Sequence, residues 1–196
     1  MSDFVSKTIG EVIKETAGHI PDHPALVATE FNVRLNYSQL YDQCRKTARG
    51  LIALGVKRGD HVSVWTTNVP EWVYLQFALG MVGAVLVTIN TNYQTHELEY
   101  IVKQSDSTTL FLIDVYRDTS FYETVRRVLP ELDRDKPGKI DSPNLPLLKN
   151  IVYIGQREST PGMFKFQDLI RMGESVSEEA LDERMKSLSD DDVINM

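Results

Sequence analysis

Apolar residues recur along this chain with two alternating spacings. From residue 36 the spacing is helical: a capping pair, Asn36 and Gln39, precedes apolar positions three or four residues apart, and Gly55 follows the last of them. A short apolar run at 61–66 then predicts a strand. The apolar positions of this first predicted helix are Leu40, Cys44, Ala48, Leu51 and Ile52.

The same unit of helix and strand repeats further along the chain. Asn68, with Pro70 two residues later, is typical of a helix cap followed by a proline in the first turn, where the missing N–H does no harm. Ser120 and Glu123 form another predicted capping box. Predicted helices therefore begin at Pro70, Thr95 and Ser120, and predicted strands cover 85–89, 109–113 and 151–154.

These strands are apolar almost throughout, and Val85–Ile89 contains a single polar residue. Strands of this kind are buried on both faces, which is typical of a parallel sheet under helices. Because strands and helices alternate with short connections, we predict an α/β fold: an open, mostly parallel sheet with helices on both faces. Before it, two short apolar runs flank a turn at 29–32 and predict a β-hairpin at 24–35.

All residues, 1–196, are predicted to form part of one large domain. The hairpin (24–35) comes first, and repeated strand and helix units follow (36–129). A loop with several prolines (130–149) is predicted to be an insertion or a mobile flap. The last units (150–196) contain two short helices and a closing turn of three aspartates that leads into a strand from Val193.

Composition narrows the classes of partner. Hydrophobic residues make up 42% and charged residues 25% of the chain, which are ordinary values for a globular protein. The formal net charge of −7 is unfavourable for binding a phosphate backbone, so we expect no nucleic-acid partner. The densest basic group, Arg126, Arg127 and Arg134, is interleaved with acidic residues and is interpreted as a solvated face.

Three features predict a cytoplasmic protein. The single cysteine, Cys44, excludes an internal disulfide and suits a reducing compartment. The longest apolar run, Phe77–Ile89, has 13 residues, fewer than the roughly 20 that span a bilayer, so we expect no transmembrane segment. Residues 1–16 carry acidic side chains and lack the apolar centre of a secretory signal.

The chain has no recognisable catalytic constellation. Neither the glycine-rich loops that bind dinucleotides or triphosphates nor a nucleophile elbow occurs. His19 and His23 are four residues apart, but the prolines around them argue against a helix that would make them joint metal ligands. Cys44 lies on the apolar stripe of its predicted helix and is interpreted as a core residue. We therefore predict no catalytic and no metal-binding residues here.

Polar runs follow the predicted strands. Ligands of open parallel sheets bind beyond the carboxyl ends of the strands, so these runs are candidates for the rim of a substrate pocket. Capping and turn roles account for the same residues and are the more frequent explanation. The candidates are Thr67 and Asn68 after the first strand and Asn90, Asn92 and Tyr93 after the second, with Asp114 following the third.

Five segments follow one another in a characteristic order: Leu35–Leu40, Gly55–Val62, Asn68–Glu71, Phe77–Asn90 and Glu97–Asp106. Together they resemble the start of the adenylate-forming (AMP-binding) superfamily, which includes acyl-CoA synthetases, luciferases and peptide-synthetase adenylation domains. Each segment alone is explained by capping or packing, and their order makes the resemblance specific. The sequences of residues 65–68 and 90–93 are most similar to those of fatty acyl-CoA synthetases.

The resemblance implies the N-terminal part of an ATP-dependent acyl-CoA synthetase (fatty acid–CoA ligase). Such enzymes join a carboxylic or fatty acid to ATP, release pyrophosphate, and pass the acyl group from AMP to the thiol of coenzyme A. ATP, Mg²⁺ and coenzyme A are then the cofactors of the intact enzyme. The family's phosphate loop follows a strand similar to Asp191–Met196 and is not contained in this sequence. We therefore expect a chain that binds no cofactor alone, is inactive, and self-associates through apolar surface.

Two other functions remain open on the sequence. The chain is alternatively the N-terminal part of another adenylate-forming enzyme, either a luciferase-like enzyme or a peptide-synthetase adenylation domain. In the second alternative it is a free-standing, flavodoxin-like binding module that uses the polar runs at the strand ends.

Overall fold

Five strands form one parallel sheet in the computed structural model, which describes residues 6–196. The first five residues of the acidic start considered above lie outside the described part. The strand order is β4-β3-β5-β8-β9, and every neighbouring pair is parallel. The strands are β3 (His61–Trp65), β4 (Val85–Thr88), β5 (Thr109–Ile113), β8 (Asn150–Ile154) and β9 (Phe164–Lys165).

The order of the strands makes the sheet doubly wound. After β3 the chain passes through α3 (Pro70–Val82) to β4, and it then crosses back to place β5 on the other side of β3. The first strand of the sheet therefore lies between the second and the third, and the remaining two are added in sequence. This arrangement confirms the predicted open, parallel α/β fold. The two-residue strand β9 was not predicted.

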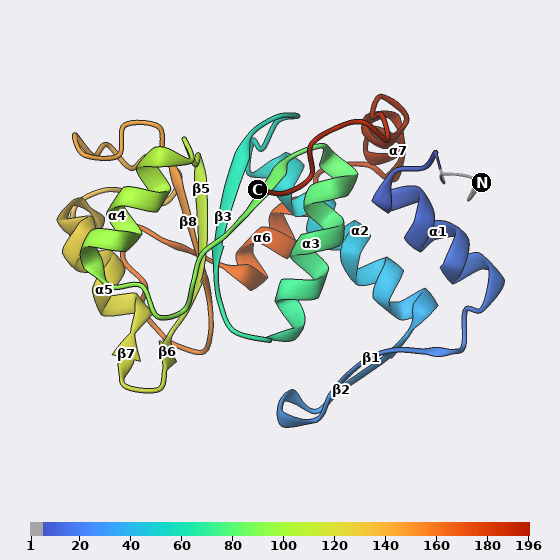
Figure 1. The fold of residues 1–196 in the computed structure, drawn as a ribbon, viewed down its shortest axis with the longest axis horizontal. Helices are drawn as coiled ribbons and strands as arrows, with labels where there is room; N and C mark the ends of the chain where they lie inside the picture. The colour runs from blue at the N-terminus through green and yellow to red at the C-terminus, as the bar shows by residue number, and fades with distance from the viewer. Residues whose placement is uncertain (1–5) are drawn as a thin grey trace, which may run out of the picture.

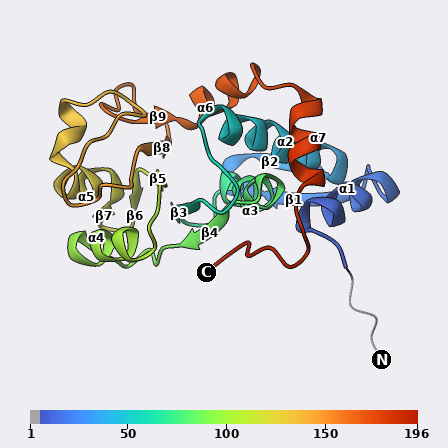
Figure 2. The ribbon, with the colours of Figure 1, turned by 90° about the horizontal axis from the view of Figure 1, so that it is seen from above.

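Helices cover both faces of the sheet, as predicted. The other helices are α1 (Ile9–His19), α2 (Tyr37–Ala53), α4 (Thr95–Gln104), α5 (Phe121–Val128), α6 (Phe166–Gly173) and α7 (Glu178–Lys186). Seen from above, α4 and α5 lie on one side of the strands, and α2, α3 and α6 lie on the other (Figures 1 and 2). α1 and α7 pack outside α2 and α3 and add a further layer on that side.

α1 is a helix that the apolar pattern did not predict. Thr8 caps it, because its hydroxyl accepts a hydrogen bond from the Glu11 amide (3.2 Å) and its own amide donates to the Glu11 carboxylate (2.8 Å). Ile13 is buried on its inner face. The helix ends at His19, so His19 and His23 do not share a helix.

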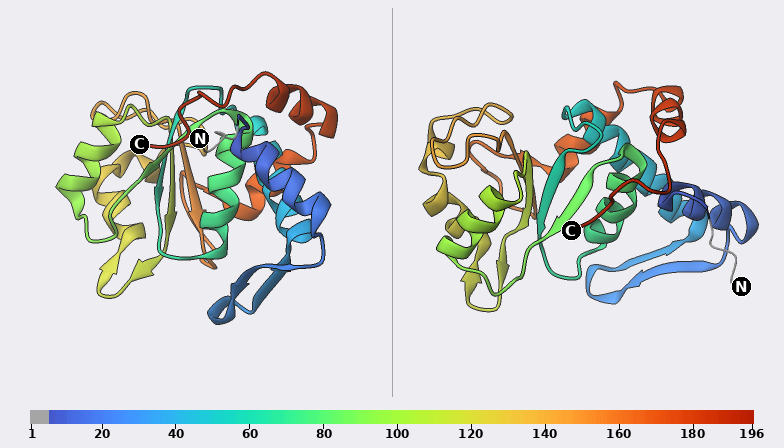
Figure 3. Two further views of the ribbon diagram at one scale, coloured as in Figure 1. Left: turned by 45° about the vertical axis from the view of Figure 1, so that its right-hand side comes forward. Right: turned by 45° about the horizontal axis from the view of Figure 1, so that its top comes forward.

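Two small hairpins lie at the same end of the molecule, one below α2 and one below the strands and α5 (Figure 3). The first pairs β1 (Pro24–Ala28) with β2 (Val33–Asn36) in antiparallel fashion through the short 3₁₀ turn η1 (Thr29–Phe31), which confirms the predicted hairpin. The second pairs β6 (Val115–Tyr116) with β7 (Thr119–Ser120) and was not predicted.

The predicted helix caps are only partly present. Asn36 and Gln39 form the complete capping box of α2. Ser120 accepts from the Glu123 amide, but Glu123 makes no return bond to Ser120 and instead lies 3.8 Å from Arg126. The predicted cap of α3 is wrong: Val69 occupies the N-cap position without a side-chain hydrogen bond, and Pro70 opens the helix as predicted.

Two glycines allow α2 and α6 to cross at very close range. A Cβ atom on Gly50 would lie 2.6 Å from the Leu169 carbonyl oxygen, and one on Gly173 would lie 2.6 Å from the Gly50 nitrogen. The backbones of the two helices therefore touch where any larger residue would separate them. This contact fixes α6, and with it the position of β8 and β9 on one side of the sheet.

The loop at 130–149 is anchored to the core. It begins with the 3₁₀ helix η2 (Pro130–Asp133) and contains four aliphatic side chains that are at most 3% exposed: Leu132, Ile140, Leu145 and Leu148. These anchors are spread along the segment, so the loop packs against the protein at both ends and in its middle.

The closing segment lies beside the free edge of β4. The Leu86 amide donates to the Ile194 carbonyl (2.9 Å), and the Met196 amide donates to the Leu86 carbonyl (3.0 Å), which makes one parallel bridge between Leu86 and Asn195. The predicted strand from Val193 is therefore present as a single bridge and not as a complete strand.

Candidate functional site: the carboxyl edge of the sheet

All five strands run in the same direction, so their carboxyl ends meet at one edge of the sheet. The two hairpins described above lie at this edge (Figures 1 and 3). In a doubly wound sheet the binding crevice is expected at the switch point, where the chain reverses its winding direction. Here the switch point lies between β3 and β5.

An aromatic stack occupies the switch point. Trp65, the last residue of β3, stacks on Phe121, the first residue of α5, with ring centroids 3.8 Å apart and an interplanar angle of 2°. Both side chains are fully buried (0% exposed). The Trp65 indole donates from Nε1 to the Asn90 carbonyl oxygen (3.1 Å), which ties the end of β3 to the end of β4. The crevice is therefore filled by protein side chains.

A groove of about 430 Å³ lies between the first hairpin and the start of α3. Apolar side chains form most of its walls, with Val27 and Phe31 contributed by the hairpin and Trp72 by α3. Val27 and Phe31 are 47% and 46% exposed, so the hairpin presents apolar surface to the groove. The volume falls within the range of small-molecule pockets.

Two of the predicted rim residues lie next to this groove. Asn68 lines it directly and is exposed, and no hydrogen bond of its side chain is found within residues 6–196. Thr67 is half-buried, and its carbonyl oxygen accepts from the Thr66 hydroxyl (3.1 Å) and the Val69 amide (2.8 Å). Since Asn68 does not cap α3, its amide is available to a ligand.

The other three predicted residues form the next loop and do not line the groove. The Asn90 side chain accepts from the Asn92 amide (2.9 Å), and the Tyr93 amide donates to the Asn90 carbonyl (3.0 Å). Asn92 is exposed, and Tyr93 packs partly against the core. The structure thus places Asn90 in a turn and does not bring the two groups of candidates into one pocket.

A charged and aromatic cluster lies at the ends of β5 and β8. Arg157 donates from Nε to the Asp114 carboxylate (2.7 Å), and its guanidinium carbon lies 4.2 Å from the centroid of the Tyr122 ring. Tyr122 in turn meets Tyr153 edge to face at 5.9 Å. Asp114 was among the polar runs at the strand ends; Arg157 was missed, although it follows the end of β8 by three residues.

Three side chains whose pKa values are shifted lie on α2 and α3. Burial raises the pKa of the Cys44 thiol to about 12, and it also raises the pKa of Glu71. Burial, and then the charges of Glu71 and Cys44, raise the pKa of Tyr74 to about 12. Cys44 is fully buried, and it is a core residue as predicted. These groups lie close together in the helical layer, and Glu71, in the first turn of α3, follows Pro70 at the groove.

Within residues 6–196 no group of three or more His, Cys, Asp and Glu side chains is placed to hold a metal ion. None of the helices in this part of the chain is sufficiently long and apolar to cross a bilayer.

The model of the AMP-binding enzyme family matches residues 13–191 of the chain. The chain belongs to this family. A Bacillus subtilis protein assigned as an acyl-CoA synthetase is 44% identical over 196 residues, which are 100% of this chain and 36% of that protein. The mitochondrial medium-chain acyl-CoA ligase ACSF2 of Mus musculus is 33% identical over 172 residues, 88% of this chain and 28% of that enzyme.

Solved structures of AMP-binding enzymes have the same fold. A long-chain-fatty-acid-CoA ligase from Archaeoglobus fulgidus matches with a TM-score of 0.65 at 21% identity, over 87% of this chain and 31% of that one. An anthranilate CoA ligase in complex with anthranoyl-AMP matches with a TM-score of 0.70 at 23% identity, over 86% and 28%. The chain thus spans about a third of the length of the AMP-binding proteins that it matches.

Proposed function

We propose that the chain is the N-terminal part of an ATP-dependent acyl-CoA synthetase. The intact enzyme converts a carboxylic acid, ATP and coenzyme A into an acyl-CoA, AMP and pyrophosphate. The observation that carries the proposal is the 44% identity to a Bacillus subtilis protein assigned as an acyl-CoA synthetase, which extends over the whole chain. In this proposal all of 1–196 belongs to the large AMP-binding domain, and 130–149 is an insertion in it.

The substrate in this proposal is a fatty acid of medium chain length. The support comes from the ACSF2 enzymes of several vertebrates, which are named medium-chain acyl-CoA ligases and are 30% to 33% identical to this chain. The exposed apolar side chains of the groove, Val27 and Phe31, suit contact with an alkyl chain. Thr67 and Asn68 then serve as rim residues beside it, and Asn90, Asn92 and Tyr93 shape the neighbouring turn.

The residues of this chain do not by themselves fit a site for Mg²⁺ and ATP. The described part holds no cluster of metal ligands, and the sequence contains no glycine-rich phosphate loop. The proposal therefore assigns ATP, Mg²⁺ and coenzyme A to the intact enzyme and no catalytic residue to this chain. Chain 1–196 contributes a scaffold, and alone it is inactive.

Self-association and a cytoplasmic location are also part of the proposal. Val193, Ile194 and Met196 are 64%, 38% and 63% exposed, and their segment pairs with the outer edge of β4 at Leu86 only. An apolar segment at an open strand edge favours pairing between copies. Light scattering of the 196-residue chain should give a mass above that of the monomer, whereas a single monomeric species would exclude self-association. Cys44, buried and reduced, suits the cytoplasm.

The free-standing flavodoxin-like module is the alternative that the geometry favours least. Its ligand would enter at the switch point, and the stack of Trp65 on Phe121 fills that position. A luciferase-like enzyme or a peptide-synthetase adenylation domain would share the fold, so the acceptor of the acyl group decides between these and the synthetase.

The test is product formation by the intact enzyme. The protein is incubated with ATP, Mg²⁺, coenzyme A and a series of saturated acids, and acyl-CoA is measured by mass spectrometry. The proposal expects acyl-CoA with medium-chain acids in greatest yield. An acyl-adenylate that forms without any transfer to coenzyme A would refute the synthetase assignment and support another adenylate-forming enzyme.

A further inference from the structure

Arg157 is held in place on one side and lacks partners on the other. Its Nε atom donates to the Asp114 carboxylate (2.7 Å), and the face of its guanidinium lies against the Tyr122 ring. No partner of its two terminal amino groups is found within residues 6–196. The side chains of Arg157 and Asp114 are each 38% exposed, so the terminal groups remain accessible from solvent.

Most other arginines that form ion pairs use their terminal groups within the protein, whereas Arg134 donates only from Nε, to Asp135, and its side chain is 70% exposed. Arg45 donates from both terminal nitrogens to Glu178 and Asp182, and Arg58 donates to the Ser187 carbonyl and to Asp192. Those side chains join elements of the fold. Arg157 is different because its position is fixed while the fork of the guanidinium, which recognises oxyanions in a bidentate manner, is left unused.

A buried hydroxyl without a partner lies next to Arg157. Tyr153 is fully buried (0% exposed), and no hydrogen-bond partner of its hydroxyl oxygen is found in the described part of the chain. Leaving such a group unpaired costs roughly 1–3 kcal/mol. Burial, and then the nearby charge of Asp114, raise the pKa of Tyr153, so its hydroxyl stays protonated close to Asp114 and Arg157. The unused donors of the cluster are therefore the terminal amino groups of Arg157, and the Tyr153 hydroxyl is buried near them.

The position of the cluster also points to a ligand. Asp114 follows β5 and Arg157 follows β8, two neighbouring strands, at the edge where open parallel sheets bind their ligands. The aromatic stack fills the switch point one strand away, so the β5–β8 ends are the charged part of this edge. Against a net charge of −7, a fixed arginine with free donors provides local attraction for an anion.

We propose that Arg157 anchors an oxyanion-binding site between the ends of β5 and β8, and that the ligand presents a phosphate or carboxylate group. The terminal amino groups of Arg157 bind the oxyanion, and Asp114 and Tyr122 orient the guanidinium. Tyr153 packs against Tyr122 and holds its ring in place. Phosphate and carboxylate groups share the geometry that the arginine fork recognises. The proposed function, on which this choice of ligands rests, supplies two sources: an adenosine phosphate or pyrophosphate for a phosphate group, and a fatty acid for a carboxylate. The site binds the oxyanion alone and is not a complete site for Mg²⁺ and ATP.

Binding is measured with the 196-residue chain, without turnover, so that failure here leaves the proposed synthetase activity untouched. The probes are sodium pyrophosphate, AMP and sodium octanoate, titrated by calorimetry at constant ionic strength. The Nε–Hε signal of Arg157 is followed by NMR in the same titrations. Saturable binding of pyrophosphate or AMP identifies phosphate as the ligand group, and binding of octanoate alone identifies carboxylate.

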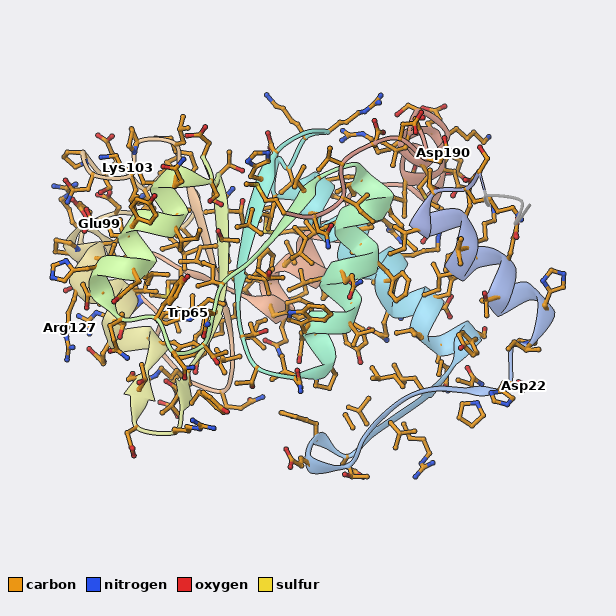
Figure 4. All side chains as sticks on the ribbon, in the orientation of Figure 1. Asp22, Trp65, Glu99, Lys103, Arg127 and Asp190 are labelled. Atoms are coloured by element: carbon orange, nitrogen blue, oxygen red, sulfur yellow. The ribbon has the colours of Figure 1, made fainter. Side chains whose placement is uncertain are left out.

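Two variants with the same charge change give the control. Arg157→Gln should weaken binding about tenfold or more, because a charge-assisted pair is lost. Arg127→Gln removes an arginine on the outer face of α5 and should leave the affinity unchanged (Figure 4). Arg157→Lys, which retains the charge and loses the fork, should be intermediate, and near-UV circular dichroism verifies that each variant is folded.

Either of two results overturns the proposal. One is the absence of saturable binding for all three probes at matched ionic strength. The other is binding by Arg157→Gln with the affinity of the unsubstituted chain, because the anion then binds elsewhere.

Discussion

Trp65 and Phe121 stack in parallel at the switch point of the sheet, 3.8 Å apart. They come from β3 and from the start of α5, so a single contact joins the first strand of the sheet to a helix on one of its faces. Figure 4 shows Trp65 in the interior of the protein, between these layers. The position that holds a ligand in other doubly wound folds is occupied by two core side chains in this chain.

The stack should be a large contributor to stability. Phe121→Ala removes a fully buried ring and should cost about 3–5 kcal/mol of unfolding free energy, because the cavity it leaves cannot collapse between a strand and a helix. Denaturant unfolding followed by tryptophan fluorescence measures the loss. Phe121→Leu is the control and should lose less. Equal stabilities of Phe121→Ala and the unsubstituted chain would show that the stack is not formed.

The crossing of α2 and α6 should not accept a methyl group. Gly50→Ala would place its Cβ 2.6 Å from the Leu169 carbonyl and should destabilise the fold by about 1–3 kcal/mol. Gly18→Ala is the matched control: Gly18 lies within α1, and a Cβ there would contact nothing within 4 Å. That variant should be neutral, or more stable by about 0.5–1 kcal/mol. Thermal unfolding of both variants compares them, and equal shifts would contradict the close crossing.

Cys44 should make the protein less stable at alkaline pH. Its thiol ionises near the ordinary value of 9.0 when unfolded, and burial raises the folded pKa to about 12. The unfolded state therefore loses its proton first, and stability is complete below pH 9 and falls as the pH rises towards 12. Relative to Cys44→Ala, the unsubstituted chain should lose about 1.4 kcal/mol per pH unit within this window. Urea unfolding between pH 8 and pH 11 measures the difference, and parallel pH profiles would contradict it.

The same burial should protect the thiol from reagents. In the folded chain a disulfide reagent should react with Cys44 only at the rate of unfolding, because the side chain is fully buried and un-ionised at neutral pH. The reaction in denaturant gives the rate of the free thiol. A fast reaction in the folded state would mean that α2 does not pack as described.

Arg58 should hold the closing segment against β4. It donates to the Ser187 carbonyl (2.9 Å) and to Asp192 (2.6 Å), directly before the residues that bridge to Leu86. In Arg58→Met, the Leu86 amide, which donates to Ile194, should exchange its hydrogen faster. The Val85 amide donates to the Asp60 carbonyl, directly before β3, and is the internal control. Unchanged exchange at Leu86 would show that Arg58 does not fix this segment.

Apolar periodicity and capping signals predicted most of the fold. The runs at 85–89, 109–113 and 151–154 are strands of one parallel sheet, and the hairpin at 24–35 is present. α1 was missed even though Thr8 and Glu11 form a complete capping box. β6, β7 and β9 were missed because strands of two residues carry no periodicity that a sequence can display.

The candidate site could be predicted only in part. The rule that ligands bind at strand ends pointed to the carboxyl edge, and it named Asn68, which lines the groove, and Asp114, which pairs with Arg157. It could not reveal that Trp65 and Phe121, more than fifty residues apart, meet and close the switch point. Nor could it show that Val69 takes the N-cap position, which leaves the Asn68 side chain free at the groove. Both facts depend on tertiary packing, which local patterns do not encode.

ATP–pyrophosphate exchange tests the central claim most directly, because the exchange requires the acid to react with ATP. It is measured for the intact protein that carries this chain and for chain 1–196 alone, each with and without octanoate. We expect octanoate-dependent exchange by the intact protein and none by chain 1–196. Absence of acid-dependent exchange in the intact protein, or exchange catalysed by chain 1–196 itself, would contradict the account.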